Sequence, residues 1–222
     1  GTLVPMLNSN SYNLPGLSAN TSYDFYVKAD CGFSSGTTNL SSWAGPYNFT
    51  TTSTGPSNKT YVPDDNFEAY LESNGMGDGI ANNDSVLTSG VFGITSLDVS
   101  NQNISDLTSI EDFTSLVSLN CKNNSLTSLD ITQNTSLKNL NCRYNRISTL
   151  DVSLNTNLVS LICNDNNLTS LDVSNNILLQ QLGCEDNQLT SIDISNNTFL
   201  DYFICGANQI ASLDISNNTS LT

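Results

Sequence analysis

The chain has 222 residues and a formal net charge of −15 at pH 7, with 21 acidic and only 6 basic side chains. So few cations exclude a basic nucleic-acid-binding face, and no apolar run approaches the roughly 20 residues that span a bilayer, so we expect neither nucleic acid binding nor membrane insertion. Histidine is absent, which rules out a Ser-His-Asp triad within this chain and removes the commonest metal ligand, so we expect no enzyme, no cofactor and no metal site.

Residues 1–52 carry one clear strand pattern. Tyr23, Phe25 and Val27 alternate with polar or amphipathic residues, which predicts a half-buried strand. With its flanking segments 14–22 and 42–51, this stretch resembles the last strands of a fibronectin type III domain, with Tyr23 at the tyrosine-corner position. Such a sandwich needs about seven strands, so the resemblance implies the C-terminal part of one, in an internal piece of a longer chain. Cys31 either pairs with a cysteine outside this piece or is free.

Residues 53–60 are rich in Thr, Ser, Gly and Pro and are predicted to be a linker. Residues 61–93 are predicted to form a cap that covers the end of the repeats behind them. We expect a short helix there, with Asp65 as N-cap, Glu68 completing a capping box, and a left-handed turn at Asn74 and Gly75. Phe67, Tyr70 and Leu71 would share its apolar face.

Two short motifs lie inside the predicted cap. The tract 74–79 is rich in Gly and Asp, but Met76 stands where a calcium-binding loop needs an oxygen ligand. The triplet from Asp84 to Val86 resembles the Asp-Ser/Thr-apolar O-glycosylation site of Bacteroidetes periplasmic and secreted proteins. That resemblance makes Ser85 a candidate modification site.

Residues 94–222 are built on a 21-residue period. The frame Leu-x-x-Leu-x-Cys-x-x-Asn recurs five times, with Phe203 in place of the second Leu in the last unit, and predicts a solenoid, in which each turn stacks on the next. Its cysteines form one column: Cys121, Cys142, Cys163, Cys184 and Cys205. Neighbouring strands lie about 4.8 Å apart, whereas disulfide Cβ atoms lie roughly 3.5–4.5 Å apart. We therefore expect free thiols buried as small apolar core residues.

Each 21-residue unit consists of two similar halves, one with the Cys and one with an Asp. Both alternate apolar and polar residues, so we expect two parallel sheets, one from each half. The side chains predicted to point inward are, in one unit, Leu116, Leu119, Cys121, Leu126, Leu129 and Ile131. A Cys-free first turn is expected from Ile94 to Val99, with an irregular second turn around Leu107, Ile110 and Phe113.

Polar residues form three further columns. Two asparagine columns are expected to support the turns by bonding the backbone; they are Asn124, Asn145, Asn166, Asn187 and Asn208, and Asn134, Asn155, Asn176, Asn197 and Asn218. The third column points outward and comprises Asp130, Asp151, Asp172, Asp193 and Asp214. Their mutual repulsion needs an offset, which hydrogen bonds to Ser or Thr or a row of calcium ions would both provide.

The repeat frame resembles the cysteine-ladder leucine-rich repeats of bacterial surface proteins, of the internalin J type and of related Bacteroidetes proteins, whose N-terminal caps are similar to residues 61–93. The resemblance implies a mainly β fold: a partial fibronectin type III sandwich, a helical cap and a leucine-rich-repeat solenoid with parallel sheets. It also implies secretion to, or display on, the surface of a Gram-negative bacterium by the type IX system, with a sorting domain beyond residue 222.

The outward positions beside the Cys column vary from turn to turn, whereas the Asp half is a monotonous run of Thr, Ser and Asp. This contrast predicts a ligand-binding face made of Lys122, Asn141, Arg143, Tyr144, Ile162, Asp165, Glu185, Asp186, Tyr202 and Ile204. The interpretation is a non-catalytic adhesion module that binds a protein or glycan on another cell or surface. Two alternatives stay open: an accessory region of a larger secreted hydrolase, and a structural stalk whose contacts are with sister chains.

Overall fold

The computed structural model of the chain describes residues 22–27, 30–34, 37–40, 42, 44–50 and 59–221. The chain divides into two compact units, Gly1–Ser57 and Asn58–Thr222. We describe each unit by itself.

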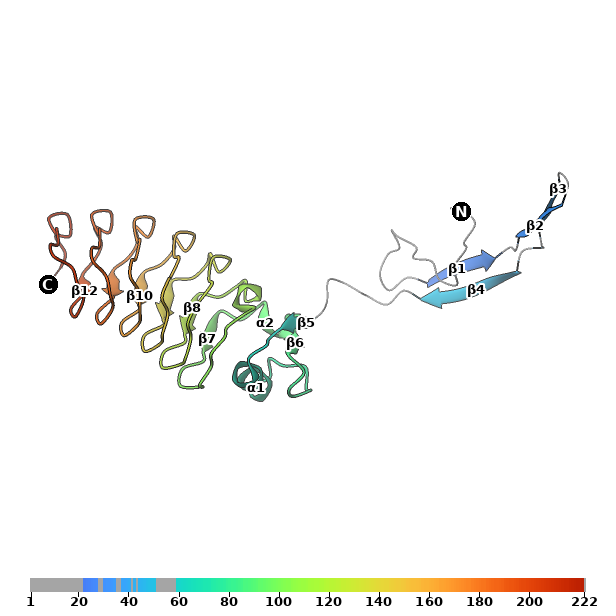
Figure 1. Cartoon of the computed structure of the whole chain (residues 1–222), viewed down its shortest axis with the longest axis horizontal. Coiled ribbons are helices and arrows are strands. Elements are labelled where there is room, and N and C mark those ends of the chain that lie inside the picture. The colour runs from blue at the N-terminus through green and yellow to red at the C-terminus, as the bar shows by residue number, and fades with distance from the viewer. Residues whose placement is uncertain are drawn as a thin grey trace. The chain divides into compact units, whose positions relative to one another are not determined.

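Within its described residues, the first unit contains two antiparallel strand pairs (Figure 1). Strand β1 (Ser22–Val27) pairs with β4 (Ala44–Thr50), and β2 (Asp30–Ser34) pairs with β3 (Thr37–Leu40). The predicted strand from Tyr23 is therefore present as β1. The partial fibronectin type III sandwich stays a prediction. The side chain of Cys31 and residues 53–58 of the predicted linker lie outside what the structure describes.

The second unit begins with a hairpin and a helix. Strand β5 (Lys59–Tyr61) pairs with β6 (Ser85–Leu87), and between them lies α1 (Asp65–Ser73). A short helix, α2 (Thr88–Val91), follows β6. Phe67 and Leu71 of α1 are fully buried, as the apolar pattern predicts. The Phe67 ring stacks on Phe113 with centroids 6.1 Å apart, so the helix packs on the first turn of the solenoid.

The prediction for the start of α1 was wrong by one residue. The N-cap is Asp64, whose carboxylate accepts hydrogen bonds from the backbone N–H groups of Asn66 and Phe67 at 3.1 and 3.0 Å. Glu68 therefore does not complete a capping box with Asp65; its carboxylate binds the loop before β6 instead. The end of the helix is as predicted, with Asn74 as C-cap and Gly75 at φ +73°.

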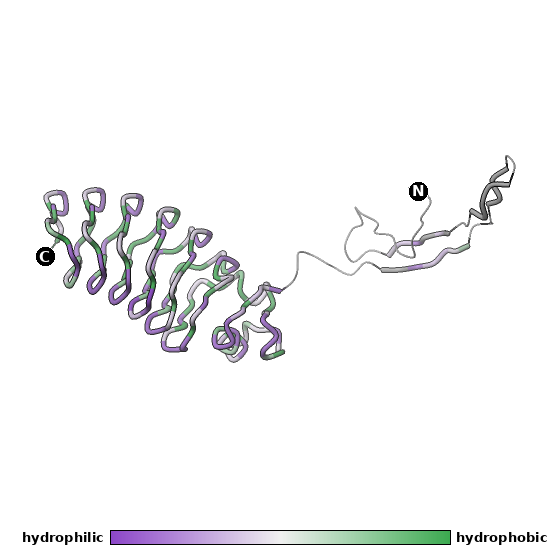
Figure 2. Tube along the Cα trace, in the orientation of Figure 1, coloured by the Kyte–Doolittle hydropathy of each residue, from purple (hydrophilic) through white to green (hydrophobic). Residues whose placement is uncertain are grey.

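The solenoid carries one parallel sheet of six short strands in sequence order (Figure 1). They are β7 (Ser96–Asp98), β8 (Ser118–Asn120), β9 (Asn139–Asn141), β10 (Ser160–Ile162), β11 (Gln181–Gly183) and β12 (Tyr202–Ile204). The central residue of each strand points into the core, which runs without interruption from Val62 to Leu200. Hydropathy alternates along every turn, with hydrophilic residues at the bends (Figure 2).

The second predicted sheet does not form within residues 59–221: the Asp half of each unit is a series of turns. Leu129 and Ile131 are buried as expected. The backbone N–H that a second ladder would need is used locally, since Thr132 N donates to the Asp130 carboxylate at 3.0 Å. The alternation of apolar and polar residues in the Asp half therefore predicted correctly which side chains are buried, but the second parallel sheet that it predicted is wrong.

The first turn also differs from the prediction. Leu97 of β7 pairs with Leu119 of β8, so Val99 takes the place that Cys121 has in the next turn. Leu107 is buried in the second half of this same turn, and a 3-10 helix, η1 (Ile110–Asp112), closes it. The segment expected as a separate irregular turn is therefore the second half of the first.

Candidate ligand-binding face

The predicted face residues occupy two neighbouring parts of each turn. Asn141, Ile162, Tyr202 and Ile204 lie on strands β9, β10 and β12, on the side opposite the core. The others lie in the bend that follows each strand: Lys122, Arg143, Tyr144, Asp165, Glu185 and Asp186. The parallel register therefore arranges both groups in columns that cross the turns.

The bend after each strand is built around a left-handed residue. This residue has φ between 50° and 58° in all six turns; the column is Asn101, Asn123, Tyr144, Asp165, Asp186 and Ala207. Backbone hydrogen bonds run along the column, for example from Asn123 N to Arg143 O at 2.9 Å and from Tyr144 N to Asn164 O at 3.1 Å. The bend is thus as regular as the sheet that precedes it.

The first asparagine column fixes this bend from inside. The Asn145 amide donates to the carbonyls of Cys121 and Cys142, both at 3.0 Å, and its oxygen accepts from Leu126 N at 3.0 Å. One side chain therefore joins two successive turns. Because buried backbone groups need partners, these asparagines hold the left-handed bend whatever residue occupies it.

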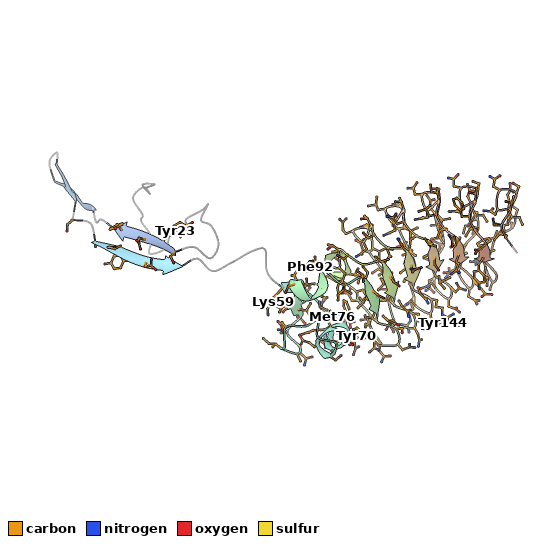
Figure 3. All side chains as sticks on the ribbon, turned by 180° about the vertical axis from the view of Figure 1, so that it is seen from behind. Tyr23, Lys59, Tyr70, Met76, Phe92 and Tyr144 are labelled. Atoms are coloured by element: carbon orange, nitrogen blue, oxygen red, sulfur yellow. The ribbon has the colours of Figure 1, made fainter. Side chains whose placement is uncertain are left out.

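A pocket of about 370 Å³ lies where the first three bends meet, lined by Asn101, Lys122, Asn123, Arg143 and Tyr144. The Arg143 guanidinium carbon lies 5.0 Å from the centroid of the Tyr144 ring, a cation–π contact. Tyr144 itself is 48% exposed and points outward from the coil (Figure 3). Two cations, an aromatic ring and two amides therefore surround one cavity.

The structure brings together three of the predicted residues here, Lys122, Arg143 and Tyr144. The predicted set of face residues does not include Asn101 or Asn123; the Asn123 amide donates to the Asn101 side-chain oxygen at 2.6 Å. Ile162 and Ile204 do not meet, because β11 lies between their strands and presents Gly183. The apolar part of the predicted face is therefore interrupted.

The next bends are acidic. Burial and the nearby Asp186 raise the pKa of Asp165, while Arg143 acts in the opposite direction. Glu185 is half-buried and Asp186 is exposed. The face thus changes sign between the third and fourth turns of the solenoid.

The carboxylates of the outward Asp column accept hydrogen bonds from nearby Thr and Ser residues, one of the two ways by which their mutual repulsion was expected to be offset. The Asp130 carboxylate accepts from both the N–H and the hydroxyl of Thr132, at 3.0 and 2.7 Å. These hydrogen bonds lower the pKa of Asp130, although burial and Asp151 raise it. Asp151, Asp172, Asp193 and Asp214 accept from the backbone two residues on in the same way.

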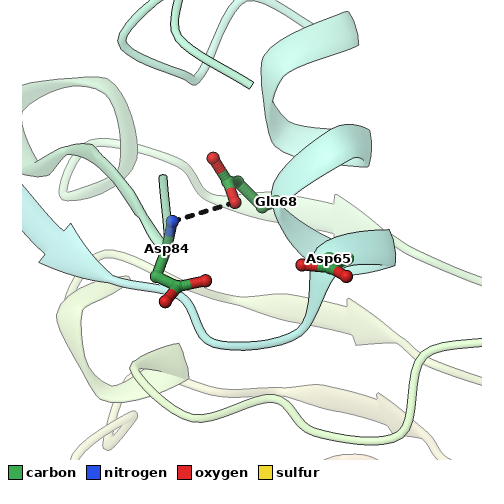
Figure 4. A group of neighbouring side chains, drawn as sticks. All are labelled: Asp65, Glu68 and Asp84. Atoms are coloured by element: carbon green, nitrogen blue, oxygen red, sulfur yellow. Dashed lines mark hydrogen bonds between the residues drawn. The ribbon is translucent and has the colours of Figure 1, made fainter. Parts of the chain in front are cut away.

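Three carboxylates meet beside helix α1, with one oxygen of each of Asp65, Glu68 and Asp84 within 4.8 Å of the others (Figure 4). Glu68 is 1% exposed. Its two oxygens accept from the backbone N–H groups of Asn83 and Asp84 at 3.0 and 3.1 Å. These hydrogen bonds satisfy the buried Glu68 carboxylate and attach the loop before β6 to helix α1.

The five ladder cysteines are free thiols, as predicted, and the first four are buried. Burial raises their pKa values, to about 12 for Cys142 and Cys184. Cys163 donates through sulfur to the carbonyl of Gly183 at 3.2 Å. The column is therefore part of the core.

Ser85 lies on β6 and is half-buried. Its hydroxyl donates to the Asn83 side chain at 3.0 Å and accepts from the Lys59 ammonium at 3.3 Å. Lys59 also forms an ion pair with Asp78 at 2.7 Å. Asp78 belongs to the tract 74–79, which by its sequence is an incomplete calcium-binding loop. The ion pair connects this tract to β5.

These features define the second unit as a leucine-rich-repeat solenoid with a cysteine ladder. Among solved structures, the chain is similar to the internalin InlF of Listeria monocytogenes, with 27% identity and a TM-score of 0.53 over 57% of this chain and 38% of that one. It also matches the functional domain of InlJ from Listeria monocytogenes, which includes a cysteine ladder, with 27% identity and a TM-score of 0.36 over 74% of this chain and 56% of that one. The chain thus spans little more than half, or less, of these neighbours.

No family model and no curated protein matches the chain. None of the helices in the described residues has both the length and the apolar character needed to cross a membrane.

Proposed function

We propose that the repeat unit is a non-catalytic recognition module of a secreted or cell-surface protein, and that it binds a protein or glycan through the face beside the Cys column. The observation that carries this proposal is the contrast within each turn. The core and the two asparagine columns repeat with little change, while the bend residues change from Lys122 and Asn123 to Arg143 and Tyr144 and then to acidic residues. A solenoid can vary such positions without altering its stacking.

The similarity to InlF supports an internalin-like scaffold for this face. Display on a Gram-negative surface through the type IX system, and O-glycosylation at Ser85, remain parts of the proposal that rest on sequence resemblance. The mass of the native protein before and after Ser85→Ala tests the modification directly.

The face itself is tested by the triple variant Arg143→Ala, Tyr144→Ala and Tyr202→Ala in the full chain. We expect attachment to cells or immobilised cell-surface extracts to be lost while the circular dichroism spectrum and melting temperature are kept. A matched triple variant on the Asp half replaces three exposed side chains with Ala; these are Thr149, Ser170 and Ser191. Attachment that survives the first triple change, or is equally lost in the second, places the binding surface elsewhere.

A further inference from the structure

The cations of the solenoid are concentrated in a short stretch. Between residues 60 and 222 the sequence contains four basic residues, all within 25 positions: Lys122, Lys138, Arg143 and Arg146. Two of these, Lys122 and Arg143, line the pocket at the first three bends. In a chain of net charge −15, this is a local positive site on an acidic background.

The pocket cations are not used in internal ion pairs. Over the described part of the chain, the ion pair that forms is Lys59 with Asp78, and neither Lys122 nor Arg143 takes part in one. The Nε atom of Arg143 is buried without a hydrogen-bond partner. The guanidinium lies over the Tyr144 ring, and its terminal N–H groups form no ion pair within the described residues, so these terminal donors can reach a ligand.

Tyr144 occupies its position at a conformational cost. Its φ is 56°, and the bends on either side place Asn123 and Asp165 at 54° and 55°. Asn and Asp tolerate this left-handed conformation, whereas a bulky aromatic residue does not favour it. Residues held in disfavoured conformations cluster at functional sites. Local backbone preference therefore does not account for the aromatic ring at this bend.

We propose that this pocket binds a single carboxylate-bearing sugar of a glycan, an inference that rests on the proposed recognition function. Arg143 and Lys122 supply charge-assisted hydrogen bonds to the carboxylate. The exposed Tyr144 ring offers an apolar surface to the C–H groups of the sugar ring. The side-chain amides of Asn101 and Asn123 both donate and accept, which suits hydroxyl groups.

The flanking charges determine the kind of acidic ligand. Asp165, Glu185 and Asp186 follow directly along the column of bends. They repel a ligand that carries many negative charges in a row, such as a heavily sulfated polysaccharide. An isolated carboxylate on an otherwise neutral glycan, from a sialic acid or a hexuronic acid, fits both the positive pocket and its acidic surroundings.

The experiment measures binding of the full chain to matched glycans. One neutral oligosaccharide is compared with the same oligosaccharide ending in sialic acid, in glucuronic acid, in the methyl ester of either, or in a sulfate ester. We expect affinity for a carboxylated form to exceed that for the neutral and methyl-ester forms by about 10-fold or more, as for a hydrogen-bonded charged group. Whether the sialic or the hexuronic form binds identifies the source of the carboxylate.

Three variants locate the site. Arg143→Gln and Tyr144→Asn should each lose the preference for the carboxylate, and Tyr144→Asn should fold at least as stably as the parent because Asn suits the left-handed bend. Arg146→Gln removes an exposed cation that does not line the pocket and should keep the preference. Equal binding of neutral and carboxylated forms, binding of sulfated forms alone, or equal losses in Arg143→Gln and Arg146→Gln would overturn the inference.

The two proposals fail in different ways. If the chain binds neutral glycans as tightly as carboxylated ones, or binds cell-surface proteins alone, and the triple face variant abolishes that binding, the recognition function stands and the carboxylated sugar is wrong. If the chain binds no glycan and no cell-surface protein, both proposals are wrong.

Discussion

Asp64 and Ser105 connect the helix to the solenoid through one carboxylate. One oxygen of Asp64 caps α1 through Phe67 N at 3.0 Å, and the other accepts from both the N–H and the hydroxyl of Ser105, at 2.8 and 2.7 Å. Burial raises the pKa of Asp64, but the hydrogen bonds from Ser105, Phe67 and Asp106 outweigh it and hold the pKa below its ordinary value. The charged form of Asp64 therefore stabilises the connection between α1 and the solenoid.

Replacing Asp64 with Ala should lower the free energy of unfolding by about 2 to 4 kcal/mol, because it removes an N-cap and several charge-assisted hydrogen bonds. The matched control is Asp65→Ala, next in sequence but exposed and not the cap, which should change stability by less than about 0.5 kcal/mol. Urea unfolding followed by circular dichroism measures both. Equal losses of stability in Asp64→Ala and Asp65→Ala would show that Asp64 does not connect α1 to the solenoid.

The second asparagine column should be costly to interrupt. Asn155 is fully buried and donates to the carbonyls of Ile131 and Asn134 at 2.9 and 3.0 Å. We expect Asn155→Ala to lose about 1 to 3 kcal/mol in urea unfolding, since buried acceptors lose a partner. Asn157→Ala, which removes an exposed bond to Thr135, should cost less than about 0.5 kcal/mol. A loss at Asn155 no larger than at Asn157 would contradict the structural role of this column.

Two aspartates should respond to acid in opposite directions. Hydrogen bonds from the hydroxyl and N–H of Ser174 lower the pKa of Asp172, so its stabilisation is present above the ordinary value of 3.8 and is lost as the pH falls through the lowered pKa. The pKa of Asp165 is raised, so its charge opposes folding at neutral pH and stops doing so in acid.

Melting temperatures between pH 7 and pH 2 check these signs. Asp172→Asn should be less sensitive than the parent to acid below pH of about 4. Asp165→Asn should melt higher than the parent at pH 7 and approach it on acidification. Parallel behaviour of the two variants would contradict the opposite pKa shifts.

The ladder thiols should be unreactive in the folded protein. With pKa values raised to about 12 for Cys142 and Cys184, roughly one thiol in ten thousand is ionised at pH 8, and the thiolate is the reactive form. In a Cys31→Ser background, a thiol reagent should label the partly exposed Cys205 first and the other four only after denaturant is added. Rapid labelling of Cys142 in the native state would disprove its burial.

The sequence predicted the repeat and its core well because both depend on spacing. All six residues expected to point inward in one unit, from Leu116 to Ile131, are buried. The absence of a strand in the Asp half could not be predicted from spacing. Leu129, Asp130 and Ile131 alternate as a strand would, and the deciding interaction is the hydrogen bond that the Asp130 carboxylate accepts from the backbone N–H of Thr132.

Other differences depend on contacts distant in sequence. Asp64 and Asp65 are both suitable N-caps locally, and Ser105, 41 residues away, holds the first of them. The 21-residue period placed Lys122 beside Arg143 correctly, but Asn101 was missed because the first turn is one residue longer than those that follow. Insertions within a repeat shift the register of everything before them.

The left-handed column separates two kinds of constraint that most surface positions combine. Its backbone shape is imposed by the first asparagine column, so the residue displayed there can change from Asn to Tyr to Asp without changing the path of the chain. Each turn therefore carries one site where new recognition chemistry can be acquired by a single substitution, at a cost limited to that bend. A stack of six turns offers six such positions in a row, so the specificity of the proposed binding face can evolve one residue at a time.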